Sequence, residues 1–169
     1  MVTKDAAAVR DKIKTWLVQE DLFKEELEDE SINFQIAAEY PARSGRYLSI
    51  IQPKEHEDMI LILSRIMLAD DHQKAFAALP FPEKERIKWQ IRYDLLFRDS
   101  SFEIQPVGQD IRSIRFSREI YYDGLTKDKL MQAIRENFKC ELYVVWKFQE
   151  LFGEGSVAKA SEPPGPMYI

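Results

Sequence analysis

Residues 111–124, IRSIRFSREIYYDG, constrain the fold more than any other stretch of the chain. Apolar residues alternate there with polar ones, a period of two that is typical of a half-buried β-strand. The Asp123-Gly124 pair ends the strand, and a long helical pattern follows it. The apolar side of the strand consists of Ile114, Phe116, Ile120 and Tyr122, and the polar side of Ser113, Arg115, Ser117 and Glu119.

One charged residue, Arg118, falls on the apolar side of this strand. A buried arginine needs a carboxylate partner, which Asp94, Glu103 or Asp123 could supply. Alternatively the strand ends there and the guanidinium meets water, or the guanidinium recognises an anionic ligand or a partner's carboxylate. The sequence therefore offers one candidate site, for which a structural strand-to-helix corner is favoured over ligand binding. It consists of Arg118, Tyr121, Tyr122, Asp123 and Gly124.

The element order follows from the same periodicities read along the whole chain. It predicts α+β architecture with a largely antiparallel sheet of about five strands, because the strands cluster and their connections are short. The continuously apolar strand 59–67 should lie centrally in the sheet, and the acidic run 25–31 should be a solvated turn. The predicted helices are 4–24, 70–79, 82–98 and 126–152, and the predicted strands are 34–40, 47–52, 59–67, 102–107 and 111–122.

The chain length of 169 residues suits one domain. We expect residues 1–152 to form it, and residues 153–169, rich in Gly and Pro, to form a C-terminal tail. The net charge of −5 argues against binding to nucleic acid or to an anionic membrane. The N-terminal segment lacks the apolar stretch of a secretion signal, and the longest apolar run is too short to span a bilayer, so the prediction is a cytoplasmic protein.

Residues that commonly carry catalysis are sparse, so the sequence predicts no catalytic residue, no metal site and no cofactor. The two histidines, His56 and His72, lack the spacing of metal ligands, and we expect His72 to be a surface residue. There is no Gly-rich phosphate loop and no G-x-S-x-G nucleophile elbow. The single cysteine, Cys140, lies among apolar residues of a helix, which favours a core position.

Three segments, 51–63, 81–106 and 116–138, resemble a family of uncharacterised archaeal proteins whose fold is related to that of type III secretion chaperones. SREIYYDGLT, residues 117–126, is the most distinctive of the shared motifs. The resemblance implies the order α-β-β-β-α-β-β-α with a strongly bent antiparallel sheet, and an archaeal origin. It also implies chaperone-like homodimers, but no catalytic residue can be transferred.

These observations favour a non-enzymatic, chaperone-like interaction module that acts as a homodimer. Aromatic residues that look exposed support this interpretation, because aromatic side chains commonly anchor interfaces; they are Tyr47, Trp89, Tyr121 and Trp146. The alternative is a small-ligand-binding protein or enzyme with its site around residues 118–123.

Overall fold

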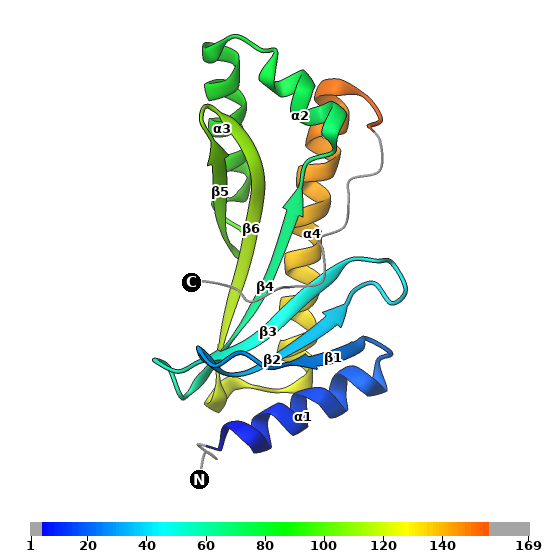
Figure 1. Cartoon of the computed structure of the whole chain (residues 1–169), viewed down its shortest axis with the longest axis vertical. Helices are drawn as coiled ribbons and strands as arrows, with labels where there is room; N and C mark the ends of the chain where they lie inside the picture. Colours follow the sequence, from blue (N-terminus) through cyan, green and yellow to red (C-terminus); the bar gives the residue numbers. More distant parts are fainter. Residues whose placement is uncertain (1–4, 156–169) are drawn as a thin grey trace.

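Six strands form one antiparallel sheet in the order β1-β2-β3-β4-β6-β5 in the computed structural model, which describes residues 5–155 (Figure 1). The strands are β1 (Phe23–Leu27), β2 (Ile32–Glu39), β3 (Tyr47–Pro53), β4 (Met59–Met67), β5 (Ser101–Val107) and β6 (Asp110–Tyr121). The helices are α1 (Ala6–Gln19), α2 (Asp70–Ala77), α3 (Phe81–Leu95), the 3-10 turn η1 (Tyr122–Gly124) and α4 (Lys127–Phe152). The predicted α+β class and antiparallel sheet are confirmed.

The sheet has one strand more than the sequence predicted. β1 spans the end of the predicted helix 4–24 and the start of the acidic run 25–31 that we expected to be a turn, and it pairs with β2 at the edge of the sheet. The first helix accordingly ends earlier than predicted, at Gln19. Its central residues, Lys24, Glu25 and Glu26, are exposed. Because neither side of this edge strand is buried, the apolar alternation that reveals the other strands is absent.

The central position predicted for residues 59–67 is confirmed, since β4 lies between β3 and β6. Side chains such as Ile60 and Ile62 are fully buried on the side that faces the helices. Burial on the opposite side is incomplete, because Arg65 is exposed and Met67 is half-buried. The prediction of burial on both faces therefore fails toward the C-terminal end of the strand.

The sheet separates into two parts between β3 and β4. These strands pair only through Ser49–Ile51 and Leu61–Leu63, whereas β4 pairs with β6 along its whole length. Figure 1 shows β2 and β3 turning away from β4 beyond this short contact. Residues 64–67 of β4 consequently have no partner in β3, and the sheet is open on that side.

Two hydrophobic cores lie under the two parts of the sheet, and α4 contributes to both. The lower core in Figure 1 joins α1, β2, β3 and the first turns of α4. The upper core joins α2, α3, β6 and the second half of α4. Residues at the centre of these cores include Ile13, Leu17, Ile36, Ile50 and Ile134 in the lower one and Phe76, Ile91, Phe116, Val144 and Phe148 in the upper one.

The limits of α4 follow the signals predicted from the sequence. Thr126 is the N-cap, and its hydroxyl accepts a hydrogen bond of 3.1 Å from the backbone N–H of Lys129. Gly153 ends the helix with a φ of +84°, a conformation that glycine adopts easily. No helix in the described part of the chain is both long and apolar enough to cross a membrane.

Buried Asn137 fixes the middle of α4 to the sheet. Its amide nitrogen donates a hydrogen bond of 3.2 Å to the carbonyl oxygen of Ile62 on β4. Its amide oxygen accepts a hydrogen bond of 2.6 Å from the hydroxyl of Ser100, just before β5. One polar side chain thus joins the long helix, the central strand and the start of the edge strand.

Candidate protein-binding face on α3 and α4

Helix α3 carries apolar residues on two opposite sides. Ile87, Ile91 and Leu95 are spaced four residues apart and lie in the upper core. A second series with the same spacing, Trp89, Tyr93 and Phe97, starts on the outer side of the helix and continues just beyond its end. Packing against the sheet accounts for the first series, so the second needs another explanation.

The outer residues are exposed to an unusual degree for aromatic side chains. Trp89 is 50% exposed, Tyr93 65% and Phe97 91%, while Trp146 on α4 is 63% exposed. We call these four residues the aromatic face. The predicted exposure of Trp89, Trp146 and Tyr121 is confirmed, whereas Tyr47 is half-buried. Clusters of exposed aromatic residues mark interaction sites far more often than isolated ones.

A groove of about 630 Å³ runs along α4, and Trp146 is the one residue of the aromatic face that lines it. Leu142, Tyr143 and Trp146 form its apolar part, and Asp94 and Arg98 border it from the α3 side. The Tyr143 hydroxyl donates a hydrogen bond to the Asp94 carboxylate across the two helices. Burial and this carboxylate raise the pKa of the Tyr143 hydroxyl, so the hydroxyl stays protonated and the two helices stay linked.

Contacts among the outer residues hold the rings in place. The rings of Trp89 and Tyr93 lie 5.9 Å apart, and the Arg92 guanidinium lies 4.7 Å from the Trp89 ring centroid. A cation over an aromatic ring is attracted to its electron-rich face. The Trp89 and Tyr93 rings are therefore ordered, and they lose less conformational entropy on binding than mobile side chains would.

Charges of both signs border the groove. Arg98, Lys139 and Lys147 supply positive charge, and Asp94 and Glu150 supply negative charge. Lys147 is almost fully buried, and its ammonium lies 3.8 Å from the Glu150 carboxylate. A surface with interspersed charges does not select a strongly acidic or strongly basic partner. Such a surface suits a partner that also carries both positive and negative charges.

The structure places Arg118 on the helix-facing side of the sheet, opposite Ile62 of β4, as the alternation predicted. Its carboxylate partner is none of the three that the sequence suggested. The guanidinium lies 3.7 Å from the carboxylate of Asp99, in the turn between α3 and β5, and the Arg118 side chain is 20% exposed. The pairing of β5 with β6 explains why Asp99 lies near Arg118. β5 begins at Ser101, which pairs with Ser117, so Asp99 just before it lies beside the part of β6 that extends beyond β5.

The other residues of the predicted site diverge. Tyr121 is 49% exposed at the end of β6, whereas Tyr122 is buried in the lower core and Asp123 and Gly124 are exposed. The backbone N–H of Tyr122 donates a hydrogen bond of 2.8 Å to the carbonyl of Asp58, and burial raises the pKa of its hydroxyl to about 12. This arrangement is what a structural strand-to-helix corner requires. A ligand site there stays a prediction.

Sequence reasoning was wrong about His72. The ring is buried against Phe148 and Phe152, which lie 6.2 and 6.1 Å from it, and its Nε2 is 2.9 Å from the carbonyl oxygen of Gly153. Only the fold brings α2 beside the end of α4, so local pattern could not reveal the contact.

Within residues 5–155, no three His, Cys, Asp or Glu side chains gather in a way that could hold a metal ion. Cys140 is buried as predicted, and burial raises its thiol pKa to about 11.

Comparison with known proteins shows the family to which this chain belongs. Residues 9–148 match a family model described as uncharacterized conserved protein DUF2299. The chain belongs to the DUF2299 family. A crystal structure of an uncharacterized protein from Methanothermobacter thermautotrophicus is 32% identical, with a TM-score of 0.80 over 85% of this chain and 99% of that one. The search of curated proteins gave no match.

A second solved structure is similar in fold alone. It is that of YbjN from E. coli, a candidate transcription regulator, with a TM-score of 0.50 and 10% identity. The similarity covers 89% of this chain and 96% of YbjN. The family match and the Methanothermobacter structure confirm the predicted resemblance of this DUF2299 chain to uncharacterised proteins, one of them archaeal.

Proposed function

We propose that this DUF2299 protein is a protein-interaction module that acts as a homodimer, and that the aromatic face forms the centre of the dimer interface. The observation that carries the proposal is the second aromatic series on α3, which no other element in the described part of the chain covers. Its exposure would be costly in an isolated monomer.

The size of the face supports a stable interface. Aromatic side chains present roughly 150–250 Å² each, so the exposed fractions of these four rings amount to about 500 Å² in one copy. A standard interface buries about 800 Å² on each partner. The aromatic face would thus supply most of the central area, and the charged border of the groove would supply the rim.

The mixture of charges supports a second copy as the partner. In a two-fold symmetric interface each surface meets itself, so cations and anions on the same surface can pair across the axis. Arg98 and Lys139 could meet Asp94 and Glu150 of the other copy in this way. The same face is compatible with a client peptide held between two copies, as in a chaperone. It is also compatible with a role in transcription regulation, the function for which YbjN is a candidate.

The mass of the protein in solution tests the proposal. Size-exclusion chromatography with light scattering at about 100 µM should give twice the monomer mass of 19.9 kDa, because even a Kd of about 10 µM leaves most chains paired at that concentration. The double substitution Phe97→Ser with Trp146→Ser should give the monomer mass. Both residues are largely exposed, so the fold should tolerate the change.

Val18→Ser provides the matched control. Val18 is 57% exposed on α1, at the other end of the molecule, so its replacement should leave the dimer intact. A wild-type chain that is monomeric at this concentration would refute the homodimer. A dimer that survives the double substitution would refute the aromatic face as its interface.

A further inference from the structure

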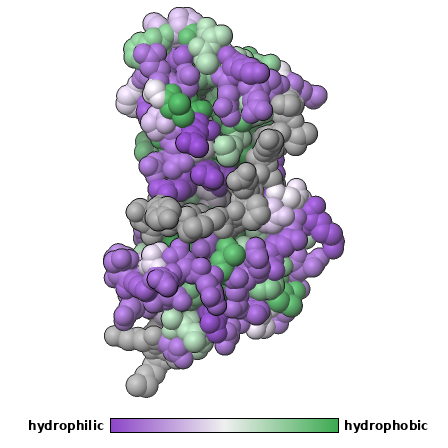
Figure 2. Space-filling model, viewed as in Figure 1, coloured by the Kyte–Doolittle hydropathy of each residue, from purple (hydrophilic) through white to green (hydrophobic). Residues whose placement is uncertain are grey.

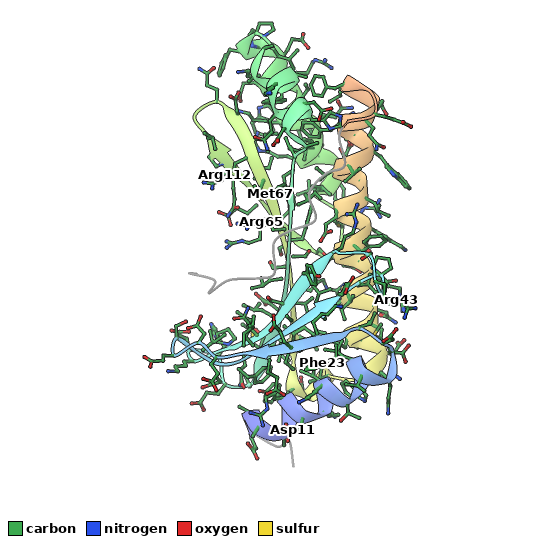
Figure 3. All side chains as sticks on the ribbon, turned by 45° about the vertical axis from the view of Figure 1, so that its right-hand side comes forward. Asp11, Phe23, Arg43, Arg65, Met67 and Arg112 are labelled. Atoms are coloured by element: carbon green, nitrogen blue, oxygen red, sulfur yellow. The ribbon has the colours of Figure 1, made fainter. Side chains whose placement is uncertain are left out.

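A second cavity of about 250 Å³, open to solvent on one side, lies at the opening between β3 and β4. The end of β4, the start of α2 and the second half of α4 form its walls, and the loop before β3 closes one end. Its apolar lining consists of Ile66, Met67, Leu68, Ala69, Val144, Val145 and Phe148. Figure 3 shows Met67 on β4 at the level of the opening. The missing β3 partner of residues 64–67 is what leaves this space unfilled.

One end of the cavity carries a cation whose hydrogen bonds are incomplete. Arg46 lines the cavity, and its Nη1 is fully buried without a hydrogen-bond acceptor. The guanidinium lies 5.7 Å from the Phe138 ring centroid, within the range of a cation–π attraction. The nearest carboxylate oxygen, Oε2 of Glu141, is 3.6 Å from Nη1, too long for a hydrogen bond. The Arg46 side chain is 24% exposed, so a ligand in the cavity meets the accessible part of the guanidinium rather than the buried Nη1.

Glu141 compensates the charge of Arg46 only in part. The carboxyl group is buried on α4, and its burial raises its pKa to about 7, although Ser64 of β4 and Arg46 both oppose the rise. A substantial share of Glu141 is therefore protonated at neutral pH. Arg46 then faces the cavity as a cation without a full counter-charge.

The other end of the cavity offers no second cation for an anion. His72 lines it, but its Nε2 is already engaged with the carbonyl of Gly153. Glu154, also at this end, would repel a second acidic group. The lining thus fits a molecule with one anionic head and an otherwise apolar body.

We propose that this cavity binds a small carboxylate with an apolar body, and that the guanidinium of Arg46 pairs with the carboxylate. A planar guanidinium matches a planar carboxylate through two parallel hydrogen bonds. A volume of about 250 Å³ holds about eight water-sized groups at roughly 30 Å³ each. An unbranched acid of about eight carbons fills that space.

Octanoate is the probe, and isothermal titration calorimetry with the full chain is the assay. Octanoate should bind the wild type, and octan-1-ol should bind more weakly. Arg46→Met with Glu141→Gln removes the cation without leaving a lone buried carboxylate, and it should weaken octanoate binding by about tenfold or more, with no such loss for octan-1-ol. Arg43→Met is the matched control, since Arg43 lies in the same loop but pairs with Asp21 on the surface.

Two further variants sharpen the test. Glu141→Gln alone removes the competing carboxylate, so it should bind octanoate more tightly than the wild type at pH 8, where wild-type Glu141 is mostly ionised, and the advantage should shrink at pH 6. Val145→Phe should block both octanoate and octan-1-ol, because the larger ring fills the cavity. Absence of octanoate binding to the wild type, or equal binding by the Arg46 variant, would overturn the proposal. Neither result bears on the proposed dimer, because Arg46 and Glu141 do not line the groove on α4 that contains Trp146.

Discussion

The buried carboxyl group of Glu141 should make the stability of this protein depend on pH. Its pKa is about 7 in the folded chain, against an ordinary value of 4.5. Between these two values the folded state binds more protons than the unfolded state, so the free energy of unfolding falls as pH rises. The contribution is fully present below pH 4.5 and is lost by the time the pH has passed about 7.

The size of this effect follows from the two pKa values. One pKa unit corresponds to about 1.4 kcal/mol, so the rise from 4.5 to about 7 corresponds to about 3 kcal/mol. Glu141→Gln keeps the shape of the side chain but cannot ionise. The variant should therefore gain about 3 kcal/mol relative to the wild type when the pH is raised from 4.5 to 8.

Urea unfolding at pH 4.5, 6, 7 and 8 measures this difference directly. Other titrating groups affect both proteins equally, so they cancel when the two free energies are subtracted. Glu55→Gln is the control, because Glu55 is exposed in the loop between β3 and β4, and surface substitutions of this kind usually change the free energy of unfolding by less than about 0.5 kcal/mol. Parallel curves for wild type and Glu141→Gln would refute the reasoning.

Three further substitutions or treatments have defined outcomes. Asn137→Leu should lower the free energy of unfolding by about 2–4 kcal/mol, since it leaves a buried carbonyl and a buried hydroxyl without their partner; a loss below about 0.5 kcal/mol would contradict this. Arg118→Met should cost at most about 1 kcal/mol, because the Asp99 side chain is 79% exposed and the pair is solvated; a larger loss in chemical denaturation would show that the pair matters more. Cys140 should resist a thiol reagent at pH 8 until the protein unfolds, given its burial and raised pKa; rapid labelling of the native protein would disprove it.

Patterns within single elements were enough to predict most of the fold. The strand at 59–67 has the predicted limits, and the final helix begins after Thr126 and ends at Gly153 as its capping residues indicate. β1 escaped prediction because its exposed, acidic residues give no periodic signal. In each case the local burial pattern, rather than the overall composition, decided whether the element could be recognised.

The candidate sites were harder to predict, because they depend on contacts between distant elements. Exposure of Trp89 and Trp146 could be inferred, but the groove beside Trp146 could not, because residues from α4 and from the α3 side form it together. Arg46 and Glu141 lie 95 positions apart in the sequence, so no local pattern connects them. A charged residue within the apolar stripe of the last helix was the one available signal for Glu141.

The continuity of α4 has a consequence for how the molecule unfolds. At about 1.5 Å per residue its 26 residues extend about 39 Å, and each half of it completes a different core. Melting either core would strip the adjoining half of the helix of its packing, and an isolated helix of a dozen residues is barely stable in water. Heating should therefore produce a single cooperative calorimetric transition in which both halves of the molecule are lost together.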